Sequence, residues 1–336
     1  MRKLALYFRP VGSYWRLVDH ELRANPGSKA LGFWPLSVAP RLDQGHFQRF
    51  DDRGLPLKWI PSMGGWVHQY CTMTAFALAN WERFLQTGSE TNLRSLLSVA
   101  DYLVESAERP SPDLVLFRVE IRGQGHVGFV SAMDHGEAMS VLCRAWQVTN
   151  QTGYLDTAVG CARAFDLPVE KGGFVDRISE NGALWYEETP GSQWSHVLNG
   201  MIYALWGLRD LHTVTGLDWV KSFLDDGLSS VQASLPLFDT GYWSLYHLPK
   251  SGQKYVASMM YHELHICQLT DLARYTGDAT FQLYAQRFTD YARRWSCRLR
   301  AGLAIGWSKV RQRFVSRPPS AATAVSAIDQ FRSSNL

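Results

Sequence analysis

The feature that most constrains the fold of this chain is an internal repeat. The dipeptide Thr-Gly occurs at residues 87–88, 152–153, 215–216 and 276–277, at spacings of 65, 63 and 61 residues. Apolar residues recur at steps of three and four before and after each dipeptide, which is typical of packed amphipathic helices. Glycine after a last helical turn can adopt the left-handed conformation that ends a helix. Each repeat therefore predicts a helical hairpin, and a single hairpin cannot bury its own apolar stripe, so the repeats must stack.

The segments between the hairpins differ in composition. They are rich in glycine, aromatic and β-branched residues, which predicts short strands or β-hairpins, at 114–130, 173–186 and 238–247. The fold class that we predict is mainly α: an incomplete (α/α) toroid of about four helical hairpins with short β-hairpins between them. We expect three regions: an irregular or short-β N-terminal segment packed on the toroid, the toroid itself, and a basic tail that becomes disordered, at 1–65, 66–296 and 297–336.

Composition excludes several classes of protein. Hydrophobic residues make up 46% and charged residues 19%, which excludes a wholly disordered chain. No apolar run is long enough to span a membrane, and the stretch Leu4–Phe8 is too short for a signal peptide, so a cytoplasmic location is expected. The five cysteines are scattered and show no metal-ligand spacing, which predicts buried free thiols. No nucleotide-binding or other cofactor motif is present, and we expect no cofactor.

Charge is unevenly distributed along the chain. The segment Arg293–Arg317 holds eight basic residues and no acid, which leaves 26 basic against 31 acidic residues elsewhere. Aromatic and aliphatic residues interleave with these bases, as they do in interfacial helices. The segment is interpreted either as a last helix with a solvated basic face or as a weak peripheral contact with the inner membrane. Binding to nucleic acid is not expected, because no recognition motif accompanies the basic run.

The repeat also locates a site. If every hairpin has the same up–down order, the first helices all begin on one face, and the linkers that precede them meet there beside helix N-termini. Any single polar residue at such a place is usually a packed core residue, but four equivalent places with similar chemistry favour a site. His262 and His265 share a helix face, yet the H-E-x-x-H spacing is absent, so no metal is predicted. Candidate substrate-binding residues are Tyr70, His135, Tyr186, Glu187, Asn199, Lys250, His262 and His265.

Five segments at these linkers resemble the C-terminal α/α domain of D-glucuronyl C5-epimerases: Ser131–Ala145, Leu184–Pro190, Val197–Leu208, Leu235–Gly241 and Tyr261–Leu269. The resemblance implies conversion of D-glucuronate to L-iduronate within heparosan-type polysaccharides. By position it implies catalytic roles for Glu188, Tyr246 and Tyr261. Two family residues are replaced, a tyrosine by Thr189 and an arginine by Pro249, and residues 1–65 leave no room for the family's large N-terminal β-barrel.

The function that we predict is inversion of C5 in uronate residues of a polysaccharide, in capsule or exopolysaccharide synthesis. The reaction removes a proton beside a carboxylate, so it needs an acid or base on each face of the sugar and a group that stabilises the enolate. Lys250, His262 or His135 could neutralise the carboxylate. The alternatives are a lyase, a glycoside hydrolase that pairs Glu188 with Asp134, Glu137 or Glu187, and a polysaccharide-binding protein without activity. The expected partner is an anionic polysaccharide, and the chain could form a homodimer.

Overall fold

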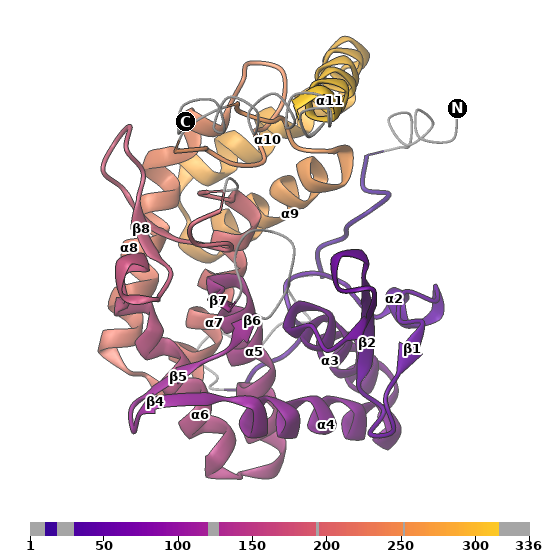
Figure 1. The fold of residues 1–336 in the computed structure, drawn as a ribbon, viewed down its shortest axis with the longest axis vertical. Coiled ribbons are helices and arrows are strands. Elements are labelled where there is room, and N and C mark those ends of the chain that lie inside the picture. Colours follow the sequence, from indigo (N-terminus) through magenta and orange to yellow (C-terminus); the bar gives the residue numbers. More distant parts are fainter. Residues whose placement is uncertain (1–10, 19–29, 120–127, 193–194, 251–252, 316–336) are drawn as a thin grey trace, which may run out of the picture.

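The structure is a computed structural model that describes residues 11–18, 30–119, 128–192, 195–250 and 253–315 (Figure 1). Four helical hairpins follow one another along the chain: α3 (Tyr70–Thr87) with α4 (Glu90–Ser106), α5 (Ala132–Thr149) with α6 (Thr152–Arg163), α7 (Leu198–Thr215) with α8 (Asp218–Phe238), and α9 (Met259–Thr276) with α10 (Ala279–Arg293). The prediction of a mainly helical fold built on four hairpins is confirmed.

The two helices of each hairpin have different environments. The first helices contact one another in the order α3, α5, α7 and α9, and α4, α6, α8 and α10 pack outside this inner row. Burial follows the same division, because almost every residue of α7 is buried, whereas α8 buries one face only. This is the arrangement of an open α/α toroid.

Helix ends show where the repeat was placed correctly and where it was not. Gly88, Gly216 and Gly277 follow α3, α7 and α9 with φ of 69°, 70° and 70°, and their backbone N–H groups close the last turns. In the second hairpin, however, Asn150 takes this role with φ of 55°, and Thr152-Gly153 already belongs to α6. The assignment of the second Thr-Gly as a helix end was therefore wrong, because asparagine also tolerates the left-handed region.

Short strands occupy the linkers. β4 (Glu108–Ser111) pairs with β5 (Leu114–Leu116), β6 (Arg118–Val119) with β7 (Phe129–Val130), and β8 (Val175–Arg177) with β9 (Leu184–Tyr186), all antiparallel. The expected strands at 114–130 and 173–186 are thus present. The expectation for 238–247 was wrong, because this segment forms only isolated bridges, among them Asp239 with Ser244 and Val197 with His247.

The N-terminal region lies against the inner helices. It contains the short helix α2 (Pro40–Asp43) and an antiparallel sheet of β1 (Arg49–Phe50), β2 (Pro56–Ile60) and β3 (Gly65–Val67). The buried Glu82 carboxylate of α3 fixes it, since its oxygens accept hydrogen bonds from the Ser37 hydroxyl at 2.7 Å and from the Val38 and Ala39 amides at 2.6 and 2.8 Å.

The chain after the last hairpin continues as helix α11 (Trp295–Val315). A disordered tail was expected further on, and residues 316–336 lie outside the described part of the chain. None of the described helices has the length and apolar character needed to cross a bilayer.

The contact between α5 and α7 depends on two glycines. A Cβ atom on Gly207 would lie 2.1 Å from the carbonyl oxygen of Gly136, and one on Gly136 would lie 2.5 Å from the Cα of Ala204. Such distances are possible only between helices whose backbones touch, so neither position can carry a side chain without moving a helix.

We predict that Gly207→Ala lowers the free energy of unfolding by about 1–3 kcal/mol, because the added methyl group forces the two helices apart. Gly153→Ala is the matched control, since a Cβ there meets no atom within 4 Å; it should leave stability unchanged or raise it by up to about 1 kcal/mol. Urea denaturation of the two variants measures both effects, and equal midpoints would contradict the close helix contact.

Candidate active site

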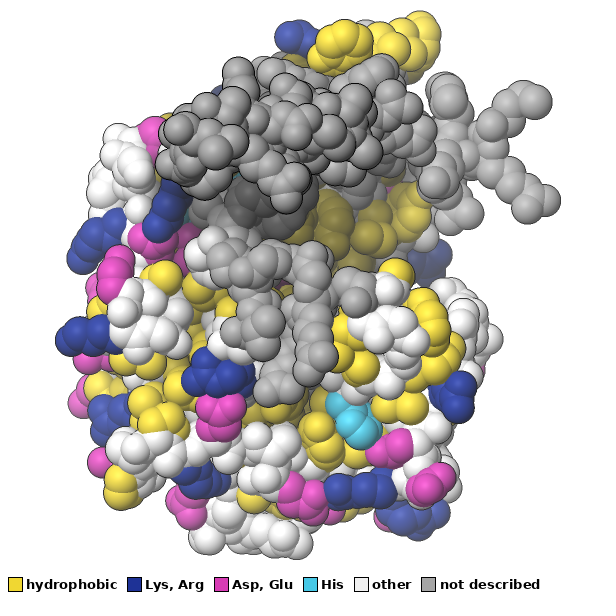
Figure 2. Space-filling model, in the orientation of Figure 1, with side chains coloured by type: hydrophobic (Ala, Val, Ile, Leu, Met, Phe, Trp, Pro, Cys, Tyr) yellow, Lys and Arg dark blue, Asp and Glu magenta, His cyan; other side chains and the backbone are white. Residues whose placement is uncertain are grey.

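Backbone hydrogen bonds tie the starts of the inner helices α5 and α7 to a neighbouring repeat. The Ala132 amide at the start of α5 donates to the Glu187 carbonyl at 2.9 Å, and the Leu198 amide at the start of α7 donates to the Tyr246 carbonyl at 3.3 Å. The first amides of a helix lack partners within it, so each linker supplies one to its neighbour. The linkers before α7 and α9 therefore meet the starts of α5 and α7, as the repeat predicts. Figure 2 shows the surface hollowed between the regions of α9 and α3, with hydrophobic side chains at the back of the hollow.

Two predicted catalytic residues form a pair. The rings of Tyr246 and Tyr261 have centroids 4.8 Å apart, and the Tyr246 hydroxyl donates a hydrogen bond to that of Tyr261. Tyr261 is held in the first turn of α9 by its backbone N–H, which donates to the Ser258 hydroxyl at 3.4 Å. Burial, and then the nearby charge of Glu188, raises the pKa of both tyrosines. Both side chains are therefore proton donors at neutral pH.

Glu188, the third predicted catalytic residue, lies beside this pair. A Cβ on Gly200 of α7 would lie 2.5 Å from Glu188 Oε2 and 2.7 Å from its Cβ, so the glycine makes room for the carboxyl group. Within the described residues Oε2 has no hydrogen-bond partner. Burial, together with the charges of Asp134 and Glu187, raises the pKa of Glu188 to about 8. A carboxyl group with that pKa can accept or release a proton near neutral pH.

Two further acids, Asp134 and Glu137, join the group from the first turns of α5. Burial raises their pKa to about 7 and about 8, and the charge of Asp134 further raises the pKa of Glu137 and of Glu188. Glu137 Oε2 accepts a hydrogen bond from the Thr74 hydroxyl at 2.7 Å, and Asp134 accepts one from the Cys71 amide. Within the described part of the chain Asp134 Oδ1 has no hydrogen-bond partner. The sequence marked these acids only as partners in hydrolysis, although acidic residues at a helix start were a visible signal.

Tyr70 lies at the edge of this group. Its ring centroid is 5.1 Å from that of Phe117, and burial and then the charges of Tyr102 and Asp134 raise its pKa, which reaches about 12. Asn199, at the start of α7, is buried, and its backbone oxygen accepts a hydrogen bond from Gln268 at 3.0 Å. Tyr70 and Asn199 thus lie in the first turns of α3 and α7, two of the inner helices whose starts form the site.

Two predicted histidines have both ring nitrogens engaged elsewhere. His135 Nδ1 lies 2.8 Å from the Ser131 carbonyl oxygen, and its Nε2 accepts from the Phe117 amide at 3.3 Å. His262 Nδ1 accepts from the Ser244 amide at 3.2 Å and its Nε2 donates to the Phe288 carbonyl at 2.9 Å. Burial lowers the pKa of His135 to about 4 and that of His262 to about 3. Both rings are neutral at pH 7, so neither can neutralise a substrate carboxylate.

Two other candidates also serve the packing of the fold. The Tyr186 hydroxyl donates to the Phe223 carbonyl of α8 at 2.9 Å, and the Tyr186 ring packs in the core. His265 Nδ1 lies 2.9 Å from the Ser244 hydroxyl, and burial lowers the pKa of His265 to about 3. Their place in the sequence resembled that of the site residues, but the fold directs them into the packing between helices.

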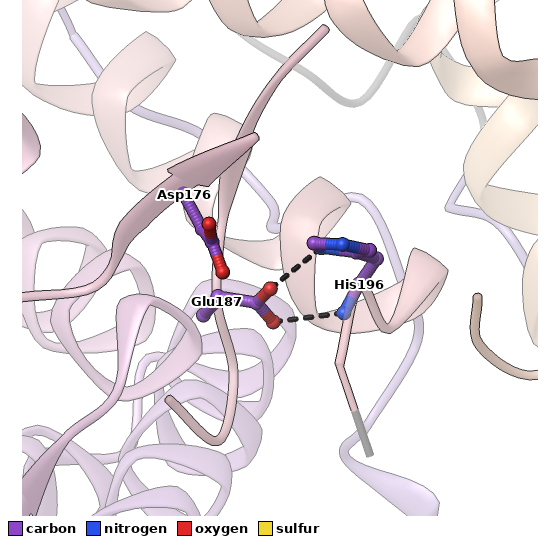
Figure 3. A group of neighbouring side chains, drawn as sticks. All are labelled: Asp176, Glu187 and His196. Atoms are coloured by element: carbon purple, nitrogen blue, oxygen red, sulfur yellow. Dashed lines mark hydrogen bonds and ion pairs between the residues drawn. The ribbon is translucent and has the colours of Figure 1, made fainter. Parts of the chain in front are cut away.

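Lys250 and Glu187 belong to a separate ionic group, shown in Figure 3. The side chains of Asp176, Glu187 and His196 point toward one another, with ligand atoms within 4.8 Å. His196 Nδ1 lies 2.6 Å from Glu187 Oε1, its amide donates to Oε2 at 2.8 Å, and the Lys250 ammonium contacts Asp176. Lys250 thus pairs with Asp176, and His196 pairs with Glu187. The contacts of Glu187 also hold His196 in the left-handed region, at φ of 51°.

Arg41 is the cation whose charge reaches the acids from the N-terminal region. It lies on α2 and lowers the pKa of Glu137 below the value that burial alone would give. Its guanidinium lies 4.4 Å from the centre of the Trp15 ring. In the described residues, therefore, the site combines buried acids of raised pKa with one peripheral arginine.

The fold and the site together define an α/α-toroid protein with a group of tyrosines and carboxylic acids at the starts of its inner helices. The chain belongs to the family of the D-glucuronyl C5-epimerase C-terminus, whose model matches residues 115–290. The resemblance read from the sequence is thereby confirmed.

Proteins that are similar to the chain include the following three. A D-glucuronyl C5-epimerase of Caenorhabditis elegans is 31% identical over 180 residues, 49% of this chain and 29% of that protein, so the match spans less than a third of the worm enzyme. An uncharacterised protein of Methanocaldococcus jannaschii is 26% identical over 221 residues, 62% of this chain and 68% of that one. The crystal structure of an unsaturated glucuronyl hydrolase from Bacillus sp. GL1 is similar to the chain, with a TM-score of 0.45 and 14% sequence identity. The match covers 76% of this chain and 64% of the hydrolase chain.

The raised pKa of Glu137 predicts a pH dependence of stability. The folded protein keeps a proton on Glu137 that the unfolded chain releases above about pH 4.5, so its contribution to stability is lost as pH rises through about 8. In Glu137→Gln the free energy of unfolding should therefore fall less steeply across this window. Denaturant titrations at a series of pH values measure the slopes, and identical slopes would show that Glu137 ionises normally in the fold.

Proposed function

We propose that the chain is an epimerase that inverts C5 of uronate residues in an anionic polysaccharide, of the D-glucuronate to L-iduronate type. The observation that carries the proposal is the placement of Glu188 beside the hydrogen-bonded pair of Tyr246 and Tyr261. Membership of the epimerase family supports the reaction class. The worm relative supports glucuronate as the substrate sugar, since its name states that substrate.

The chemistry requires proton transfer on two faces of the sugar. Glu188, with a pKa of about 8, is suited to accept the C5 proton near neutral pH. The tyrosine pair, kept protonated by burial, is suited to return a proton on the opposite face. For the reverse direction the roles exchange, as they must in an epimerase.

The enolate must be stabilised without the family arginine, which Pro249 replaces. Lys250 is bound to Asp176, and the histidines His135 and His262 are neutral. Asp134 offers a different solution, because a buried, protonated carboxylic acid can donate a strong hydrogen bond to developing negative charge. Its Oδ1 lacks a partner among the described residues, so this oxygen is available to a substrate.

The direct test is exchange of the C5 proton during incubation with uronate polymers in D₂O. Tyr246→Phe should slow deuterium incorporation roughly 10²- to 10⁴-fold, because it removes one proton donor. Tyr186→Phe is the matched control: it deletes a buried hydroxyl that bonds to Phe223 in the core and should leave exchange unchanged. A parent protein that incorporates no deuterium with any polymer of a broad panel would exclude an epimerase.

A polysaccharide lyase or glycoside hydrolase is the second candidate, favoured by the proximity of Asp134, Glu137 and Glu188. Inverting and retaining hydrolases both need two carboxyl groups, one with a raised pKa. A non-catalytic polysaccharide-binding protein would instead bind the polymer without turnover, even when Glu188 and both tyrosines are removed.

Asp134→Asn separates epimerase from hydrolase. Asparagine donates a hydrogen bond but transfers no proton, so an epimerase should keep measurable C5 exchange, whereas a hydrolase using Asp134 as its acid should lose its new reducing ends by roughly 10²-fold or more. Absorbance of an unsaturated uronate marks a lyase. Reducing ends or unsaturated products from the parent, without deuterium in recovered polymer, would overturn the epimerase assignment.

A further inference from the structure

Helix α11 exposes an apolar stripe to solvent. Four large side chains recur every fourth residue with exposed fractions of 67%, 44%, 67% and 68%: Trp295, Leu299, Leu303 and Trp307. Each step of four turns by about 40° around a helix, so the four residues form one continuous face. The opposite face holds the contacts with the protein, since Ala301 and Ile305 are buried. The apolar stripe therefore faces water and not the protein.

Such a surface is unusual for a helix at the periphery. Single exposed apolar residues are common, but an aligned group of two tryptophans and two leucines marks an interaction surface. Figure 2 shows hydrophobic side chains next to a basic one at the top edge, where Figure 1 places α11.

The charge around the stripe indicates the kind of partner. The segment Arg293–Arg317 carries eight basic residues and no acidic one, while the rest of the chain has an excess of acids. Arg293, Arg294 and Arg300 are exposed near the stripe, and the Arg300 guanidinium lies 4.0 Å from the centre of the Tyr242 ring at its edge. A protein partner would need to be both apolar and strongly acidic, whereas an anionic bilayer offers both properties in one surface.

We infer that α11 is an interfacial helix that holds the protein on an anionic lipid surface. The stripe enters the boundary between headgroups and acyl chains, with Trp295 and Trp307 at its ends, and the arginines contact the lipid phosphates. Tryptophan is enriched at that depth because its ring is apolar and its N–H is polar. The inference does not depend on the reaction catalysed at the candidate active site.

The test is sedimentation of the full chain with vesicles of phosphatidylcholine alone or mixed with phosphatidylserine. The full chain should sediment with the mixed vesicles, less with phosphatidylcholine alone, and less as salt is raised. The double variant Leu303→Ser, Trp307→Ser should reduce partitioning at least roughly tenfold, because two side chains no longer enter the apolar layer. Trp59→Ser with Leu283→Ser is the matched control, since these residues are 45% and 52% exposed outside α11.

The charge variant Arg294→Gln, Arg300→Gln should weaken binding to the mixed vesicles and reduce its salt dependence. A full chain that stays in solution with mixed vesicles would overturn the inference. The inference would also be overturned if the variant Leu303→Ser, Trp307→Ser sedimented with the vesicles like the parent. The same holds if the only effect of this variant were to convert a dimer into a monomer in analytical ultracentrifugation. Binding that depends on the arginines alone would identify a polyanion site, for example for the polysaccharide, instead of a lipid surface.

Discussion

The direct backbone contact between α5 and α7 is the constraint on which the candidate site depends. Gly136 and Gly207 allow the two helices to touch, and Gly200, about two turns nearer the start of α7, leaves the space that Glu188 occupies. The same contact brings the first turn of α5, with Asp134 and Glu137, to the linker that precedes α7. A wider separation would admit water between these acids, and their ordinary pKa values would return.

Buried carboxylic acids give the candidate site its electrostatic character, because burial is the first cause of the raised pKa of Asp134, Glu137 and Glu188. Among the described residues, Arg41 of the N-terminal region is a cation whose charge lowers the pKa of Glu137. We therefore interpret Asp134 as a hydrogen-bond donor to the enolate, a role that requires burial and would fail in a solvated cleft.

The sequence predicted the fold well, because the apolar stripe and the turn residue of each repeat are visible within a short stretch of sequence. The spacing of these stretches then gives the period of the repeat. The second helix end was misplaced because Asn150 and Gly153 are both plausible caps, and only the backbone conformation distinguishes them. The site was harder. Glu188, Tyr246 and Tyr261 came from resemblance, and the structure places them together. His262 was misassigned because its partners, Ser244 and Phe288, come from other elements that no local pattern identifies.

The account depends on burial of the carboxyl groups beside the tyrosine pair, which raises the pKa of Asp134 to about 7 and that of Glu188 to about 8. Infrared difference spectroscopy measures this directly, since a protonated carboxylic acid and a carboxylate absorb at different frequencies. Comparison of the parent with Glu188→Gln and Asp134→Asn at about pH 6 should show loss of a carboxylic-acid carbonyl band in each variant, because this pH lies below both raised pKa values and above the ordinary value of about 4. Loss of carboxylate bands alone would contradict the account, because it would show that both acids are fully ionised in the folded protein.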